Sequence, residues 1–482
     1  MSTSAATGFS RVTVVAPDSR IDVALPDDIA VADVYPEILR LTGQTQPPGA
    51  PTGYHLVRRD GTVLDSARSL TAQRVVDGEL LSLRPFAESL PPAVHDDVTD
   101  AVASAVTRDR TLWTDELLRA CGLFGGALLL GLMSFTLWFA DPRHDMHGLP
   151  GFVAAAAGVL LTALAGVRAR VYADRASAVA LGLAALPHLM IAGSGIVAPD
   201  PGESAGRLQF LLGCTVVLIA SAALVATVPT GDAPFVATLT AAATGTFAAF
   251  FAILADARPA DAAAVCAAVA IGAIAFLPGL SARAARLPIG YATPRTPAAD
   301  PVAPRGGPGP DPIDGERIAA QVRRGHELLL GLVGGCAAVV VGSAAVLAFA
   351  APAAGPWARL LALAAGLVML LRARLFRYTA QVAAVLGAGL TALALLVLGL
   401  ALQPPADATH GSLDLRALWI VIAVTLGGAL LTAVALIVPS KGLSPFWGRA
   451  SDLFENALLL ALVPLALAVL DLYSAARGLA GS

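Results

Sequence analysis

The chain has 482 residues, of which 56% are hydrophobic and only 14% charged, with a formal net charge of −3 and a mean hydropathy of +0.72. Soluble proteins carry about 25% charged residues, so this composition excludes an ordinary soluble enzyme and indicates a protein that crosses a membrane several times. The basic residues have no interleaved aromatic side chains in a soluble domain, so no nucleic-acid partner is expected.

The first predicted elements form a small domain. Short segments typical of β-strands lie at 12–14, 21–25, 54–57, 62–64 and 80–83. Val34, Ile38 and Leu41 repeat with helical spacing between the second and third of these. The order ββ-α-ββ predicts a β-grasp, ubiquitin-like domain over residues 10–86, after a disordered N-terminus at 1–9. The chain continues past the last strand without a free Gly-Gly tail, so this domain is expected to bind a partner rather than to be conjugated.

A connector is predicted at residues 87–119. Valines recur there at every fourth position, and acidic residues occupy other faces of the same helix: Val94, Val98, Val102 and Val106. This spacing indicates an amphipathic helix. Its apolar face fits the head domain itself, a partner or the membrane surface, and the sequence leaves these three open.

Eleven apolar stretches follow, each long enough to cross about 30 Å of hydrocarbon as a helix that rises about 1.5 Å per residue. Together they predict an all-α transmembrane domain at 120–471, followed by an extracytoplasmic tail at 472–482. The expected spans are 120–140, 150–167, 177–198, 208–228, 233–255, 262–280, 328–350, 355–371, 379–402, 417–438 and 454–471.

One long loop, residues 281–327, separates six spans from five. It has eight prolines between Pro288 and Pro312, which predicts an extended, solvated segment without a core of its own. With the head in the cytoplasm, the inside segments hold 18 arginine and lysine residues and the outside segments hold 6. This bias predicts a cytoplasmic N-terminus and, because the number of spans is odd, an extracytoplasmic C-terminus. We recognise no cleavable signal peptide at the N-terminus.

The spans offer little chemistry. We find no Asp, Glu, Lys or Arg near the middle of any of them, whereas ion-coupled transporters need such groups at membrane depth. His188 is the one mid-span ionisable residue. We expect it to bond a neighbouring helix near a kink at Pro187, and a proton relay is the alternative.

No nucleotide-binding, hydrolase or zinc-protease motif occurs, so the sequence predicts no enzymatic activity, no cofactor and no metal. The four cysteines all lie in apolar stretches and are expected to be packed or lipid-buried thiols: Cys121, Cys214, Cys266 and Cys336. Two GxxxG spacings, at 122–126 and 331–335, predict places where helix backbones approach closely.

Three segments resemble one known family: the head segment TVVAPDSRIDVALPDD, the connector PAVHDDVTDAVASAVTRDRTLW, and the ending SPFWGRASDLFENALLLALVPLALAVLDLYSAARG, which carries Asp471, Tyr473 and Arg477. Together with the layout of head, connector, eleven spans and proline-rich loop, they resemble EccD. EccD is the polytopic subunit of mycobacterial and actinobacterial type VII (ESX) secretion systems. The head resembles the YukD type of β-grasp domain.

This resemblance implies a structural role in the bacterial inner membrane. EccD-like subunits assemble with EccB, with EccE and with the FtsK/SpoIIIE-like ATPase EccC. The family also implies a second copy of the chain, a helix ring that holds membrane lipids, and a head that contacts the stalk of the ATPase.

Seven residues are the candidate partner contacts. They are exposed basic residues of the head, a connector tryptophan and arginines that flank the long loop: Arg58, Arg59, Trp113, Arg283, Arg286, Arg323 and Arg324. For the four loop arginines, the alternative is that they fix the membrane orientation and contact lipid headgroups.

Two other functions stay open. The first is a secondary transporter or permease with a regulatory head, for which Pro187 and Pro464 mark possible breaks in the helices. The second is a membrane enzyme that acts on lipids, for which His144 and His147 could form a weak metal site with nearby aspartates. An exposed polar loop explains these two histidines more simply.

Overall fold

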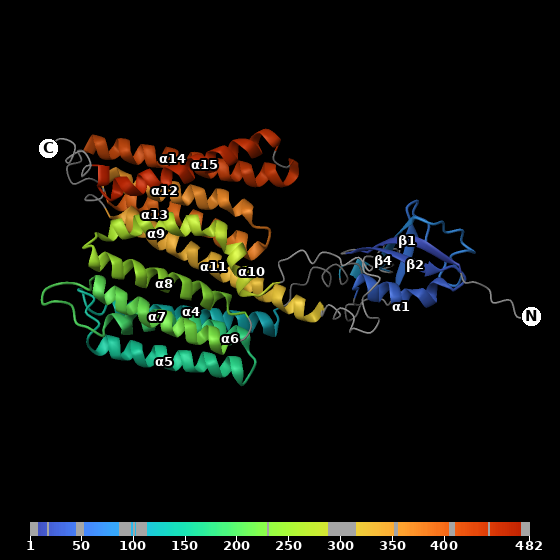
Figure 1. Ribbon diagram of the computed structural model, residues 1–482, viewed down its shortest axis with the longest axis horizontal. Coiled ribbons are helices and arrows are strands. Elements are labelled where there is room, and N and C mark those ends of the chain that lie inside the picture. The colour runs from blue at the N-terminus through green and yellow to red at the C-terminus, as the bar shows by residue number, and fades with distance from the viewer. Residues whose placement is uncertain are drawn as a thin grey trace, which may run out of the picture. The chain divides into compact units, whose positions relative to one another are not determined.

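A computed structural model describes residues 8–16, 19–44, 53–85, 98–99, 102, 113–228, 231–287, 315–350, 355–403, 410–441 and 444–473. The chain divides into two compact units, Met1–Trp113 and Thr114–Ser482, which are described separately. We call them the head and the helical unit (Figure 1).

The head is one four-stranded sheet with a single long helix. Its elements are β1 (Phe9–Val15), β2 (Arg20–Pro26), α1 (Val31–Thr42), β3 (Tyr54–Arg58) and β4 (Glu79–Pro85). The strand order is β2-β1-β4-β3, in which β1 runs antiparallel to β2 and parallel to β4, and β3 runs antiparallel to β4. The predicted order ββ-α-ββ is therefore confirmed.

The core of the head follows from the alternation of side chains along its strands. Val12 and Val14 of β1 and Leu81 of β4 are fully buried, and Ile38 of α1 packs in the same cluster. Burying each such side chain contributes about 1.5–3 kcal/mol. The prediction for Leu41 was wrong: α1 turns Val31, Val34, Ile38 and Thr42 inward and leaves Leu41 exposed.

Two predictions for the rest of this unit need comment. The segment 62–64 forms only an isolated bridge, between Val57 and Val63, and not a strand. The predicted connector helix at 87–119 lies largely outside the described residues. Its last part belongs to the first membrane helix, which starts at Asp115 because the hydroxyl of Thr114 caps it by accepting from the Leu117 amide, at 3.3 Å.

The helical unit contains these helices: α4 (Asp115–Trp138), α5 (Leu149–Arg170), α6 (Arg175–Ser194), α7 (Arg207–Thr227), α8 (Ala233–Leu254), α9 (Pro259–Ala273), η1 (Ile274–Phe276), α10 (Leu277–Ala284), α11 (Gly315–Phe349), α12 (Gly355–Arg372), η2 (Ala373–Leu375), α13 (Thr379–Leu402), α14 (His410–Lys441) and α15 (Pro445–Val469). Ten spans in the described residues are long and apolar enough to cross a membrane, with α9, η1 and α10 forming one of them. α12, the eighth predicted span, is not among these ten.

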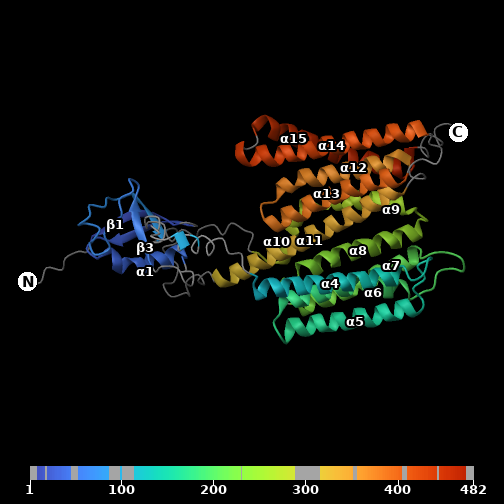
Figure 2. The same ribbon diagram turned by 180° about the vertical axis from the view of Figure 1, so that it is seen from behind.

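The helices of this unit lie roughly side by side, with α5 and α14 at opposite edges (Figures 1 and 2). α11 packs against α8, α9 and α13 and so connects the earlier helices with the later ones. Its buried side chains, such as Val333 and Val340, join the largest core cluster, which also includes Leu361 of α12 and Val385 of α13.

One of the two predicted GxxxG contacts is formed. A Cβ at Gly331 would lie 2.5 Å from Cβ of Val236, and one at Gly335 would lie 2.8 Å from the Ala237 carbonyl oxygen, so α11 and α8 touch through glycine. Gly122 and Gly126 of α4 have nothing within 4 Å of a built Cβ. The first pair therefore packs two helices within this chain, and the second pair faces open space.

The prolines that suggested broken spans do not break them. α6 runs through Pro187 and α15 runs through Pro464, each as one helix. The broken helices expected for a secondary transporter are therefore not formed at these two positions.

Candidate functional site

The two head arginines proposed as partner contacts have different environments. Arg58, at the end of β3, pairs through Nε with Oε1 of Glu79 at 3.1 Å, and its Nη2 donates to the Gln73 carbonyl at 2.6 Å. Arg58 therefore ties strands and loop of the head together. Arg59 is exposed and is the one of the two that faces solvent.

The five candidates from the connector and the long loop also differ in their exposure and pairing. Trp113, Arg283, Arg286 and Arg323 have exposed side chains. Arg283 lies in the last turn of α10, and Arg286 follows with φ of +54°. Arg323 lies in the first third of α11. These four are available to a partner.

Arg324 is instead an internal tie. Its guanidinium pairs with Asp232, which precedes α8 and is fully buried, and with Oε2 of Glu327 at 3.6 Å. Glu327 also accepts from the Gly231 amide at 2.9 Å. Removing Arg324 would leave a buried carboxylate unpaired, which is costly. Its role is to fix α11 to the start of α8.

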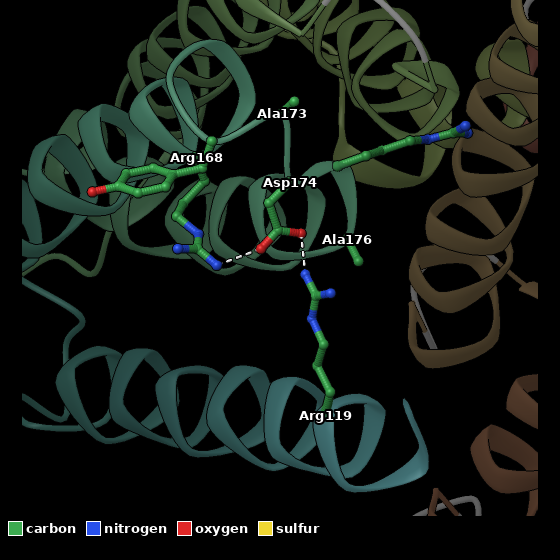
Figure 3. A pocket seen from close by; sticks show the side chains of 7 residues that line it. Arg119, Arg168, Ala173, Asp174 and Ala176 are labelled. Carbon is green, nitrogen blue, oxygen red and sulfur yellow. Dashed lines mark hydrogen bonds and ion pairs between the residues drawn. The ribbon is translucent and has the colours of Figure 1, made fainter. Parts of the chain in front are cut away.

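A hollow of about 590 Å³ lies where α4 begins and where the loop from α5 to α6 turns. Asp174 lies between Arg119 of α4 and Arg168 of α5 and pairs with both (Figure 3). The guanidinium of Arg168 also lies 5.1 Å from the ring centroid of Tyr172.

Asp174 is also the N-cap of α6, because its Oδ1 accepts from the Ser177 amide at 3.2 Å. Hydrogen bonding to Ser177, with the two arginines, lowers the pKa of Asp174 to about 2. The hollow has three arginines against this one acid, since Arg175 lines it as well. It is therefore a positively charged surface that suits an acidic side chain or a lipid phosphate. The contacts of Asp174 also join α4, α5 and the start of α6.

A recurring contact that the sequence did not indicate joins the ends of the helices. Arginine side chains donate to main-chain carbonyls at or near the end of another helix, whose last carbonyls have no partner within the helix. Arg170 donates to Thr227 and Ala226, both at 2.7 Å, at the end of α7. The other arginines that do this are Arg207 (to α8 and the loop after it), Arg258 (to α15), Arg372 (to α9) and Arg416 (to α13).

Three histidines each have a ring nitrogen within hydrogen-bonding distance of a main-chain carbonyl. His188 is fully buried, but Nδ1 lies 2.9 Å from the Ala184 carbonyl of its own helix, so the expected bond to a neighbouring helix was wrong. His144 Nδ1 lies 2.8 Å from the Trp138 carbonyl, and His147 Nδ1 lies 2.9 Å from the Gly195 carbonyl. In the described part of the chain, no three His, Cys, Asp or Glu side chains are grouped to hold a metal.

Cys214 and Cys336 are buried, as expected for packed thiols, whereas Cys266 is half-buried and Cys121 is exposed on α4. None of the four is in a disulfide.

Comparison with known families identifies both units. Residues 118–479 match the family model described as EccD-like transmembrane domain, which covers more than half of the chain. The chain belongs to the EccD family. Residues 9–83 match the model described as WXG100 protein secretion system (Wss), protein YukD, so the head is ubiquitin-like, as predicted.

One curated relative is similar over nearly the whole of both chains, and another over less than half. The chain is 26% identical to the ESX-4 secretion system protein eccD4 of Mycobacterium tuberculosis over 512 residues, covering 98% of each chain. It is 28% identical to the ESX-3 secretion system protein EccD3 of the same species over 212 residues, 42% of this chain and 43% of the relative. The EccD-like transmembrane domain and the ten apolar helices make this chain a multi-pass membrane protein.

Two solved structures share the fold. Protomer 1 of the ESX-3 core complex contains a chain that matches with a TM-score of 0.58 and 21% identity, covering 97% of this chain and 100% of that one. A chain of the MycP5-free ESX-5 inner membrane complex, State II, matches with a TM-score of 0.53 and 22% identity, covering 88% and 99%.

Proposed function

We propose that this protein is a non-enzymatic structural subunit of a type VII secretion membrane complex. The observation that carries the proposal is that one chain joins a YukD-type head to an EccD-like transmembrane domain. In such a subunit, the helical unit is a fixed platform in the membrane, and the head is a docking module.

The helical unit has the properties of a platform. Arginine contacts to the ends of neighbouring helices, together with the Arg324–Asp232 pair, hold helices that are far apart in sequence. These contacts leave little freedom at the helix ends, because each satisfies carbonyls or a carboxylate that would otherwise be unpaired.

We infer that the platform pairs with a second copy of itself. The apolar windows of α6 and α11 have 56% and 50% of their residues buried within the chain, whereas α4 has 6% and α14 has 0%. Helices with so little packing of their own offer surfaces to another subunit or to lipid. The EccB- and EccE-like partners would use these same exposed surfaces.

We infer that the head, on the cytoplasmic side, contacts the FtsK/SpoIIIE-like ATPase EccC. The four solvent-facing arginines among the candidates give that side exposed positive charge: Arg59, Arg283, Arg286 and Arg323. Arg58 and Arg324 are withdrawn from this list because they are paired within the chain.

Co-purification tests the docking role. The tagged full chain is compared with Arg59→Glu and with a deletion of the head that leaves the helical unit intact. We expect the deletion to lose the ATPase and Arg59→Glu to reduce its recovery severalfold, while membrane insertion is unchanged. Arg74→Glu, another arginine exposed on the head, is the matched control. Full recovery of the ATPase with the headless chain would contradict the docking role.

A further inference from the structure

Two arginines of the helical unit have charges that the chain does not match. Arg359 lies near the start of α12, and Arg416 lies near the start of α14. Nε of Arg359 and Nη1 of Arg416 are buried and have no hydrogen-bond partner in the structure. Among the described residues, neither arginine forms an ion pair with a carboxylate. Both are therefore unusual, because buried N–H groups are almost always paired.

Other arginines on the same predicted side of the membrane do have acids. Arg207 pairs with Asp256 at 2.6 Å, and Arg258 pairs with Asp261 and Asp471, both at 2.9 Å. On this side, two of the arginines that join helix ends therefore have an acid beside them. The lack of an acid at Arg359 and Arg416 requires a separate explanation.

The two unmatched guanidiniums act on each other. Arg416 lies close enough to Arg359 for their like charges to interact. Arg416 cannot easily turn away, because its Nη2 donates to the carbonyls of Leu400 and, at 3.1 Å, of Gln403 at the end of α13. Gln403 adds a buried Oε1 without a partner. Two like charges that are partly removed from water are unfavourable unless an anion joins them.

The surroundings indicate that this anion is a lipid headgroup. Trp357, two residues before Arg359, and Trp419, three residues after Arg416, are 48% and 63% exposed, and tryptophan is enriched where headgroups meet hydrocarbon. Leu360, which follows Arg359, and Leu418, which precedes Trp419, are exposed as well and offer apolar surface to an acyl chain.

We propose that Arg359 and Arg416 bind the phosphate group of an anionic membrane lipid at the extracytoplasmic ends of α12, α13 and α14. Guanidinium groups recognise phosphate oxygens with paired N–H donors, and both residues are half-buried rather than enclosed, so part of each stays accessible to a headgroup. The site belongs to the isolated chain, so it does not depend on the proposed role in secretion.

Thermal unfolding of the full chain in dodecyl maltoside tests the proposal. We titrate dioleoyl-phosphatidylglycerol, dioleoyl-phosphatidylcholine and inorganic phosphate in turn. The midpoint should rise with phosphatidylglycerol at concentrations where phosphatidylcholine and inorganic phosphate have little effect. Arg359→Gln should weaken the apparent affinity for phosphatidylglycerol roughly fivefold, because one arginine near an anionic membrane surface is worth about that factor.

The stability of Arg359→Gln without lipid gives a second test. Because Arg359 makes no hydrogen bond or ion pair with the residues that the structure describes, the variant without lipid should be at least as stable as the natural chain. Arg143→Gln, which changes an exposed arginine in another extracytoplasmic loop, should respond to lipid like the natural chain.

Three results would overturn the proposal. The first is an unchanged response of Arg359→Gln to phosphatidylglycerol, which would point to an acidic protein partner instead. The second is full stabilisation by inorganic phosphate alone, which would show that no lipid is needed. The third is a loss of stability without lipid in Arg359→Gln that Asp407→Asn shows as well. Asp407 lies between α13 and α14, outside the described residues, and this result would show that its carboxylate pairs with Arg359.

Discussion

At the scale of single residues, arginine organises this molecule. The chain has one lysine and 31 arginines. Arg170 shows what arginine adds, because Nε and Nη2 satisfy two adjacent carbonyls at once, which an ammonium group does less well. Arg324 and Asp174 show the second use, in which a charge pair fixes the point where a helix starts. Several of the cationic side chains that sequence reasoning assigns to orientation therefore also join helices.

Asp174 gives a prediction about pH at this scale. The folded chain holds the pKa of Asp174 at about 2, below its ordinary value of 3.8, so the charged form stabilises the fold. This stabilisation is fully present above about pH 4 and is lost as the pH falls toward 2. Asp174→Ala should cost about 1–2 kcal/mol at pH 7, because it removes both the N-cap and the charge.

Asp174→Asn is the matched control, since asparagine still caps a helix. It should cost less than Asp174→Ala, and the difference from the natural chain should be constant from pH 8 to pH 5. Thermal midpoints in detergent across this range measure both effects. A difference that changes between pH 8 and pH 5 would mean that another group controls this end of α6.

At the scale of elements, close packing between α11 and α8 holds the two parts of the helical unit together. Gly331 and Gly335 allow this contact, whereas Gly122 and Gly126 of α4 have the same spacing and no neighbour. The contrast shows that a GxxxG spacing indicates only the capacity for close approach. Which pair is used depends on the helix that the fold places opposite.

The two glycine pairs make a controlled comparison. Gly331→Ala or Gly335→Ala should destabilise the purified chain by about 1–3 kcal/mol, because the added methyl group meets a Cβ or a backbone oxygen at under 3 Å. Gly122→Ala should have little effect or stabilise slightly, because alanine favours a helix. Thermal unfolding in neutral detergent measures the difference. Equal losses at Gly122 and Gly331 would contradict the packing described here.

Local patterns determined which elements could be predicted. Val12 and Val14 alternate, and the membrane spans are continuous apolar runs, so both signals lie within a few neighbouring residues. Leu41 was misassigned because the helical repeat fits either of two adjacent faces, and only the sheet decides between them. His188 was misassigned because the sequence does not show that its ring reaches back one turn.

The contacts of the candidate site were less predictable for a different reason. Arg170 reaches residues more than 50 positions away, and Arg324 pairs with an acid 92 positions away. No local pattern encodes such pairs. The only hint in the sequence was an arginine in the first or last turn of a span. Arginines at these positions also determine membrane orientation, so their presence does not show that they join helices. The unmatched pair of Arg359 and Arg416 is visible only in the fold, where α12 and α14 both contact α13.

At the scale of the whole molecule, the chain combines a head with its own closed core and a helical unit that leaves some helices almost unpacked. The head buries thirteen residues in one cluster. In the helical unit, α14 buries none of its apolar window. Such surfaces face lipid or another subunit. The proposed role as a subunit of a larger complex would account for both properties, since such a subunit needs a separate docking domain and free helix faces.

The mass and composition of the particle extracted from the membrane test this account most directly. The full chain, tagged at its N-terminus, is extracted in mild detergent and studied by native sizing and mass spectrometry. We predict a particle many times larger than the 48.7 kDa chain, with more than one copy of it, an FtsK/SpoIIIE-like ATPase and EccB- and EccE-like partners. A monomer or dimer without the ATPase, from cells that express all of these partners, would contradict the structural role in secretion.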